Sequence, residues 1–275
     1  MFRRWCINLY SQYIDPLIGP ERLSPNVIIL GAQKAGTTSL YHYMAEHPDI
    51  LASKTKEVHF FDLNYNRGQN WYRYHFLPRT RDNEKCWCVE SSPYYLYHPL
   101  VAARIKSCLP DVRFIVMLRD PVTRALSHYW HEYRRGRESL SFKDALDREQ
   151  ERLAGTTQAL MNGEMTTSFN HQRYSYFSRG LYAQQLSHWF SYFSRDQFLI
   201  LESENFFANP SSGMATLTEF LDIAPFSNIE FTRHNSGSYK EQTNPEVLDA
   251  LRAAYRAPNL ELAELLGCQF SWTTI

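Results

Sequence analysis

The chain has 275 residues, of which 44% are apolar and 21% are charged. This is an ordinary globular composition, and the length allows one large domain with a sizeable core. The formal net charge at pH 7 is zero, so no field of the whole molecule favours nucleic acid or an anionic membrane. We therefore expect any anion-binding site to be local, and we predict no nucleic-acid partner.

The beginning of the chain lacks the marks of a targeting segment. Its first 25 residues contain no long apolar run, which argues against both a signal peptide and a membrane span. We predict that residues 1–24 are an N-terminal extension of a soluble, cytoplasmic protein.

The cysteines are odd in number and irregularly spaced: Cys6, Cys86, Cys88, Cys108 and Cys268. The C-x-C pair at positions 86 and 88 has no matching His/Cys cluster at metal-ligand spacing. We predict buried free thiols in a reducing compartment, and no metal site.

The first predicted strand is the apolar run at residues 26–30, and the helical pattern after it stops before Pro48. Continuous apolar runs recur at residues 113–118 and 197–202. Strands that read as unbroken apolar runs are typical of a parallel sheet covered on both faces.

A side-chain cap followed by proline marks the start of three later helices. Asp120, Asn209 and Asn244 each precede a proline in this way, and such pairs favour a helix N-terminus. Gly267 is expected to end the last helix, predicted at residues 259–267. The alternation of strands and helices predicts an α/β fold, a three-layer α/β/α P-loop-like architecture with a central parallel sheet.

Residues 136–178 are polar, rich in Ser, Thr, Gln and Arg, and contain no strong strand. We predict a helix plus mobile loops inserted over the active site, because such segments often carry function. The insertion would belong to a single domain at residues 25–275.

The stretch GAQKAGTTS at residues 31–39 resembles a phosphate-binding loop with its lysine displaced. Two glycines bracket four residues as in the Walker A pattern, but Thr37 follows the second glycine and Lys34 lies inside the loop. A strand, a glycine-bounded turn and a helix that opens with hydroxyl residues form an anion cradle. A purely structural strand–helix junction is the alternative.

The residues around this loop resemble the 5′-phosphosulfate loop of sulfotransferases that use 3′-phosphoadenosine 5′-phosphosulfate (PAPS). The pattern is that of the carbohydrate and heparan-type branch and its bacterial relatives, and it covers roughly residues 25–272. It continues in blocks at residues 56–62, 68–76, 89–99, 113–130, 179–210 and 265–272.

This resemblance implies a role for each residue that matches a family motif. Lys34 would neutralise the departing phosphate, while Arg119 and Ser127 would grip the 3′-phosphate of PAPS. The full cofactor-binding set that it implies is Lys34, Ala35, Gly36, Thr37, Thr38, Ser39, Arg119, Ser127 and Lys240. The plain alternative for Arg119 is a surface charge at a strand end, and we expect Arg124 to be a solvated helix residue.

Glu57 resembles the family's general base, and His59 is the rival. Strand alternation would place both side chains on one face, so that either could reach the acceptor. The apolar neighbours Val58, Phe60 and Phe61 could desolvate the Glu57 carboxylate and strengthen it as a base. Lys56 would either keep it ionised or contact the acceptor or the sulfonate. A structural ion pair is the remaining alternative for this group.

The sequence departs from the heparan branch in one block, because Ser91 and Ser92 follow Glu90 where that branch often has a lysine. Local positive charge for a polyanionic acceptor is offered only by residues 133–137, with Arg73, Arg79 and Arg81, and we expect each such cluster to be a solvated face.

We predict a metal-independent sulfotransferase that uses PAPS to sulfonate a hydroxyl, or less readily an amine, of a carbohydrate or glycoconjugate. A non-catalytic nucleotide- or glycan-binding protein with this fold is one alternative. A magnesium-dependent P-loop kinase is another, although Asp120, its candidate metal ligand, is better used as a helix cap.

Overall fold

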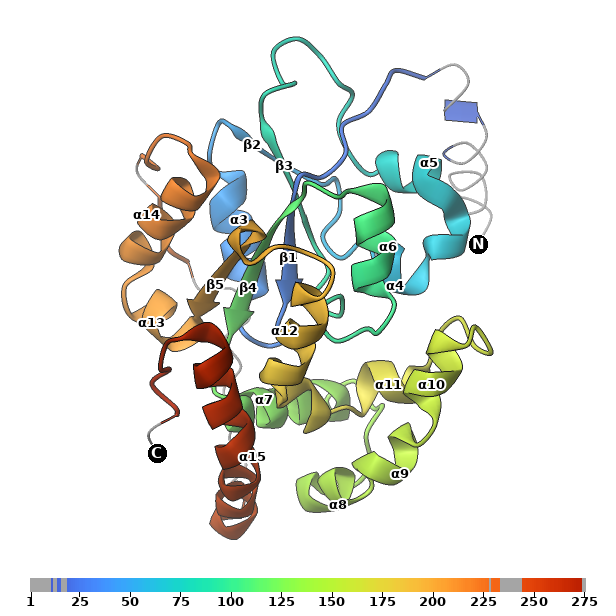
Figure 1. Cartoon of the computed structure of the whole chain (residues 1–275), viewed down its shortest axis with the longest axis vertical. Helices are drawn as coiled ribbons and strands as arrows, with labels where there is room; N and C mark the ends of the chain where they lie inside the picture. Colours follow the sequence, from blue (N-terminus) through green and yellow to red (C-terminus); the bar gives the residue numbers. More distant parts are fainter. Residues whose placement is uncertain (1–10, 12–13, 16–18, 228, 233–243, 274–275) are drawn as a thin grey trace.

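The computed structural model describes residues 11, 14–15, 19–227, 229–232 and 244–273. Its centre is a five-stranded, all-parallel sheet with the order β2-β3-β1-β4-β5. The strands are β1 (Val27–Gly31), β2 (Ile50–Ala52), β3 (Trp87–Ser91), β4 (Arg113–Leu118) and β5 (Phe198–Glu202). Figure 1 shows the sheet in the middle with helices on both sides, which confirms the predicted three-layer α/β/α fold.

Helices on both faces connect the strands. Helix α3 (Thr37–Ala45) joins β1 to β2 on one face, and α14 (Pro210–Leu221) covers the same side. On the other face lie α6 (Val101–Cys108) and α12 (Tyr182–Phe190), which precede β4 and β5. This is the arrangement that right-handed crossovers give when the strand order reverses between β1 and β4.

The predicted strands agree with β1, β4 and β5 to within one residue, whereas β2 and β3 were not predicted. β3 lies inside the sheet between β2 and β1, yet its sequence WCVES contains Glu90, whose side chain is fully buried. A buried carboxylate interrupts the apolar run that identifies such a strand. β2 has only three residues, too few for a periodic pattern.

The predicted helix caps are present. Asp120 accepts hydrogen bonds from the amides of Val122 and Thr123, both at 3.2 Å, at the start of α7 (Pro121–Tyr133). Asn209 and Asn244 cap α14 and α15 (Pro245–Leu266) in the same way.

The separate last helix predicted at residues 259–267 is wrong, because α15 runs unbroken through Pro258 and ends at Gly267, whose φ is 65°. Proline in a helix interior removes one hydrogen bond. The buried side chains of Tyr255, Asn259 and Leu262 hold both sides of the proline in one helix.

Residues 136–178 form four short helices rather than one helix with loops: α8 (Phe142–Asp147), α9 (Glu149–Leu153), α10 (Thr156–Met161) and α11 (Phe169–Arg173). They lie with α7 beyond the carboxyl ends of the strands (Figure 1). The smaller elements are α4 (Phe60–Leu63), η2 (Tyr65–Arg67), α5 (Gly68–Arg73), η3 (Ser178–Gly180), η4 (Arg195–Gln197) and α13 (Ser203–Ala208).

Arg124 was expected to be solvated, but its side chain is fully buried. It lies on α7 and donates a hydrogen bond to the carbonyl of Tyr176. It therefore supports the chain before η3 and does not face solvent.

Four of the five cysteines lie in the described residues, and all four are free thiols. Only Cys88 is buried; Cys86 and Cys108 are partly exposed and Cys268 is exposed, so the expected burial is confirmed for one of them. Within the described ranges, no group of three His, Cys, Asp or Glu side chains is placed to hold a metal ion. Nor is any helix of the described chain long and apolar enough to cross a membrane. The cytoplasmic location stays a prediction.

Candidate functional site

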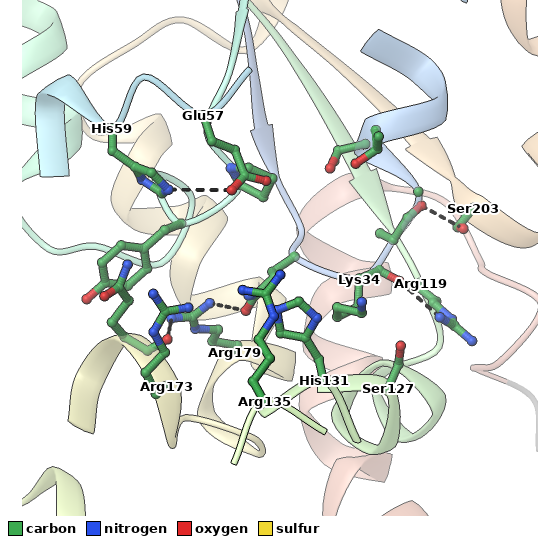
Figure 2. A pocket seen from close by; sticks show the side chains of 18 of the residues that line it. Lys34, Glu57, His59, Arg119, Ser127, His131, Arg135, Arg173, Arg179 and Ser203 are labelled. Atoms are coloured by element: carbon green, nitrogen blue, oxygen red, sulfur yellow. Dashed lines mark hydrogen bonds and ion pairs between the residues drawn. The ribbon is translucent and has the colours of Figure 1, made fainter. Parts of the chain in front are cut away.

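A cavity of about 680 Å³ opens at the carboxyl edge of the sheet. Open α/β sheets bind ligands at this edge, where the strand order reverses. The loop after β1, the residues around Glu57, the end of β4, and parts of α7, α11, η3 and α13 line it. Figure 2 shows these side chains converging on one space.

The loop after β1 is shaped by two residues with left-handed backbone conformations. Lys34 has φ 74° and Gly36 has φ 94°. A Cβ atom at Gly36 would also collide with the ring of Phe207 from α13, so glycine is required at this position on two counts. The hydroxyl of Ser203 donates to the carbonyl of Ala35 at 2.9 Å and ties the loop to α13.

Helix α3 begins directly after this loop and presents its N-terminus to the cavity. Its N-cap is Gly36, and no side chain caps it. Thr37 and Thr38 line the cavity. Uncapped amides and hydroxyl groups at a helix N-terminus are suited to binding an anion. Ser39 is fully buried and is not among the described residues that line the cavity.

Lys34 and Arg119 lie together on the same side of the cavity. The Arg119 guanidinium donates to the backbone carbonyl of Lys34 at 3.0 Å. Burial, and then the positive charges of Arg134 and Arg119, lower the pKa of the Lys34 ammonium. Ser127 of α7 completes this end (Figure 2). Among the predicted phosphate ligands, Lys240 lies outside the described residues.

Glu57 and His59 face the cavity from a turn, so the expected strand at this point is wrong. Both residues have positive φ, 60° for Glu57 and 53° for His59. The turn nevertheless brings the two side chains together, with 3.6 Å between Glu57 Oε2 and His59 Nε2. Asp62 Oδ2 lies 2.7 Å from His59 Nδ1, and Lys56 Nζ lies 2.8 Å from Glu57 Oε1.

These contacts set the charges of the two candidate bases. Burial alone would lower the pKa of His59, but Asp62 and then Glu57 outweigh it and raise that pKa to about 10. The neighbouring His59, and then Lys56, hold the pKa of Glu57 well below its usual range despite partial burial. At neutral pH the imidazole is therefore already protonated, and Glu57 is the group of this pair that can accept a proton.

The expected apolar surrounding of Glu57 is also wrong. Phe60 and Phe61 point into the core, and 48% of the Glu57 side chain is exposed. The reason is the left-handed turn, which directs the flanking aromatic rings away from the carboxylate.

Side chains from the block at residues 89–99 accept hydrogen bonds from the backbone of this turn and of the residues after it. Ser92 Oγ accepts from the His59 amide at 3.0 Å, and the Tyr95 hydroxyl accepts from the amides of Phe60 and Phe61 at 2.8 and 3.2 Å. Ser92 in turn donates to the buried Glu90 carboxyl at 2.5 Å. Burial raises the pKa of Glu90 to about 7. Backbone strain at two positions so close together persists only where neighbours fix it in this way.

Arginines line the opposite wall, and none of them is among the predicted site residues. Arg134 and Arg135 follow α7, Arg173 ends α11, and Arg179 belongs to η3. The cluster at residues 133–137 was expected to be only a solvated face, yet two of its arginines line the cavity. The signal that could have identified them is their position just after α7, which starts at the end of β4.

Two of these wall arginines are fixed by surrounding groups. Arg173 lies 3.5 Å from the buried carboxylate of Glu132 on α7. Arg179 is buried, donates to the carbonyl of Gln172 at 2.6 Å, and lies over the ring of Tyr94 at 4.6 Å. Arg135 is exposed and forms no ion pair with the described acidic residues.

One lysine and five arginines line the cavity, and Glu57 is the only carboxylate among its described lining residues. The excess of positive charge is therefore local to this cavity, because the formal net charge of the whole chain is zero.

Known proteins resemble this chain in sequence. Human heparan sulfate glucosamine 3-O-sulfotransferase 3B1 is 31% identical over 271 residues, covering 90% of this chain and 65% of the relative. A membrane-associated sulfotransferase of Dictyostelium discoideum, kil1, is 26% identical, covering 94% of this chain and 68% of the relative. This chain thus spans slightly under two thirds of the human relative.

A solved structure of a sulfotransferase also resembles this chain. The crystal structure of a sulfotransferase from Alicyclobacillus acidocaldarius superimposes with a TM-score of 0.75 at 28% identity, covering 91% of this chain and 99% of that one. Residues 24–257 match the family described as the sulfotransferase domain. The chain therefore belongs to the sulfotransferase domain family.

Proposed function

We propose that this protein transfers a sulfonate group from PAPS to a hydroxyl of a carbohydrate or glycoconjugate. The observation that carries the proposal is a single cavity with Lys34, Arg119 and Ser127 at one end and Glu57 at the other. Family membership supports sulfonate transfer, and the names of the human relatives support a carbohydrate acceptor.

The nucleotide would bind where the loop after β1 meets Arg119. The amides at the start of α3 and the hydroxyls of Thr37 and Thr38 suit the 5′-phosphate. The planar guanidinium of Arg119, together with Ser127, suits the 3′-phosphate, because arginine can donate two parallel hydrogen bonds to phosphate oxygens. These two phosphate sites would distinguish PAPS from nucleotides that lack a 3′-phosphate.

The reaction needs one bond formed, one bond broken and one proton removed. The acceptor oxygen attacks sulfur, and the bond between sulfur and the bridging oxygen of the 5′-phosphate breaks with its electron pair left on that oxygen. Lys34 stabilises the resulting charge. The acceptor proton passes to Glu57 and then to solvent. The products are a sulfate ester and adenosine 3′,5′-bisphosphate.

The acceptor would itself carry negative charge. In Figure 2, Arg173 lies on the side of His59, away from Arg119 and Ser127, and Arg135 lies between the two sides, across from Glu57. Cations on the wall that faces Glu57 are suited to a carboxylate or sulfate group of a second substrate. The relatives named for heparan sulfate are consistent with such an acceptor.

Isothermal titration calorimetry with adenosine 3′,5′-bisphosphate tests the nucleotide assignment. Lys34→Ala and Arg119→Ala should each weaken binding by about tenfold or more, since each removes a charge-assisted contact to phosphate. Arg148→Ala, an exposed arginine at the end of α8, is the matched control and should bind normally.

Unchanged affinity in both variants would remove the cofactor assignment. Mass spectrometry then tests transfer itself, by looking for the gain of one SO₃ group on a panel of anionic and neutral oligosaccharides incubated with PAPS.

A further inference from the structure

Two cations hold the Glu57 carboxylate, one on each oxygen. Lys56 Nζ lies 2.8 Å from Oε1, and His59 Nε2 lies 3.6 Å from Oε2. Each of them favours the ionised form of the carboxylate and so weakens it as a proton acceptor. General base catalysis is most efficient when the base has a pKa near the operating pH. The two cations therefore restrain the Glu57 carboxylate as a base in this arrangement.

His59 is fixed in place. Its Nδ1 lies 2.7 Å from Asp62 Oδ2, and the Asp62 side chain is completely buried. Its backbone amide donates to Ser92 Oγ at 3.0 Å. The buried Asp62 carboxylate also offsets the positive charge of the imidazolium. His59 thus orients Glu57, and the Asp62 carboxylate largely balances the charge of the His59 imidazolium.

Lys56 has fewer described partners than His59. Within the described residues, Glu57 provides the only hydrogen bond and the only ion pair that its ammonium makes. Its charge sits on a flexible four-carbon stem, and the side chain is 17% exposed. No carboxylate of the described chain other than Glu57 pairs with it. Lys56 is therefore the uncompensated cation on the base and the one that can be withdrawn.

We propose that Lys56 restrains the Glu57 base and that a negative group on the acceptor releases it by drawing the ammonium away. The proposal rests on the function proposed above, with Glu57 as the base. With an anionic acceptor, the Lys56 ammonium exchanges its ion pair with Glu57 for an ion pair with the acceptor. With a neutral acceptor, the ammonium would lose its charge-assisted hydrogen bond to Glu57 and gain nothing in its place. Lys56 is thus a specificity-determining residue that couples the charge of the acceptor to the strength of the base.

Other charged groups around Glu57 do not provide this coupling. His59 is paired with Asp62, as described above. Lys34 and Arg135 lie across the cavity from Glu57 (Figure 2), and neither forms an ion pair with it in the described chain. The buried Glu90 contacts Ser92 beneath the turn and does not touch Glu57.

Kinetics with a matched pair of acceptors tests the proposal. The pair is a uronic-acid-containing oligosaccharide and the same oligosaccharide with its carboxyl groups reduced to alcohols. The wild-type protein should prefer the charged acceptor in kcat/KM, and Lys56→Met should reduce that preference by about tenfold. Lys56→Met should also move the acid limb of the pH profile of kcat/KM upward by about 1 pH unit, because a cation next to the base is gone.

Two variants serve as controls. Lys56→Arg keeps the charge and should retain both the preference and the pH profile. Lys54→Met removes a nearby lysine that is exposed and donates to the carbonyl of Tyr74 at 2.9 Å, and it should behave as the wild type. An unaltered preference in Lys56→Met, or an equal loss of kcat on both acceptors with no shift of the pH profile, would overturn the proposal.

A measurement without turnover separates this proposal from the proposed function. Titration of the ¹³C-labelled Glu57 carboxyl by NMR, assigned with Glu57→Gln, should give a higher pKa in Lys56→Met than in the wild type or in Lys54→Met. Equal values would show that Lys56 does not restrain the carboxylate. Failure of the proposed function would instead appear as no sulfonate transfer by the wild-type protein from PAPS to any acceptor.

Discussion

The two ends of the cavity are built differently. At the end proposed to bind the nucleotide (the nucleotide end), the backbone amides, the hydroxyl groups and Arg119 lie on segments that directly follow β1 and β4. At the end proposed to bind the acceptor (the acceptor end), the arginines come from the end of α7, from α11 and from η3. They face the left-handed turn that carries Glu57. The first end depends on the sheet, whereas the second depends on the packing of separate short elements.

This difference matches the substrates proposed for the two ends. A cosubstrate of fixed shape suits donors that rigid strands and a helix N-terminus hold in place. An anionic glycan suits long side chains such as Arg135, which can adjust to the position of a carboxylate or sulfate. Substitutions at the two ends should therefore have different kinetic effects.

The largest effect is expected at Glu57. Glu57→Gln should lower kcat by about 10² to 10⁴, because the acceptor proton loses its base, while affinity for adenosine 3′,5′-bisphosphate stays within about twofold of the wild type. The control Glu84→Gln changes an exposed glutamate and should leave both quantities unchanged. Full activity of Glu57→Gln in a sulfonate-transfer assay would show that Glu57 is not the base.

Substitutions of Arg135 and Ser127 should have moderate effects, each on a different substrate. Arg135→Ala should raise the acceptor KM about tenfold, by loss of a charge-assisted contact, and leave nucleotide affinity intact. Ser127→Ala should do the reverse, weakening the nucleotide severalfold with little change in acceptor KM. If either substitution altered both constants equally, the division of the cavity into two ends would be wrong.

The smallest effect is expected on stability at high pH. The pKa of His59 is raised to about 10 in the folded protein, against about 6.5 when unfolded. Its contribution to the free energy of unfolding is therefore complete below pH 6.5 and is lost as the pH rises to 10. Urea denaturation should show the advantage of the wild type over His59→Gln shrinking by about 1 kcal/mol or more over that range. A constant difference would mean that the histidine is not held protonated.

Most of the sheet and the side of the cavity next to β1 and β4 could be predicted from the sequence, because their signals are local. β1 and β4 are unbroken apolar runs, and the residues proposed to bind phosphate lie in the segments that follow them. β3 was missed because Glu90 is buried within it. A buried carboxylate in a strand is satisfied only by tertiary partners, here Ser92 and Tyr72.

The acceptor end could be predicted only in part. Glu57 and His59 were identified as a pair, but their backbone geometry depends on hydrogen bonds that the amides of His59 and Phe60 donate to Ser92 and Tyr95. Both acceptors are more than 30 positions away in the chain. Arg173 reaches the cavity with the help of Glu132 on a different helix. Such placements follow from packing, and no periodic pattern in the sequence encodes them.

A crystal structure of the protein with adenosine 3′,5′-bisphosphate would test the central claim most directly. The account predicts the 5′-phosphate against Lys34 and the start of α3, the 3′-phosphate against Arg119 and Ser127, and open space between Lys34 and Glu57 for an acceptor. A nucleotide bound among the arginines of α7 and α11, or bound outside this cavity, would contradict it.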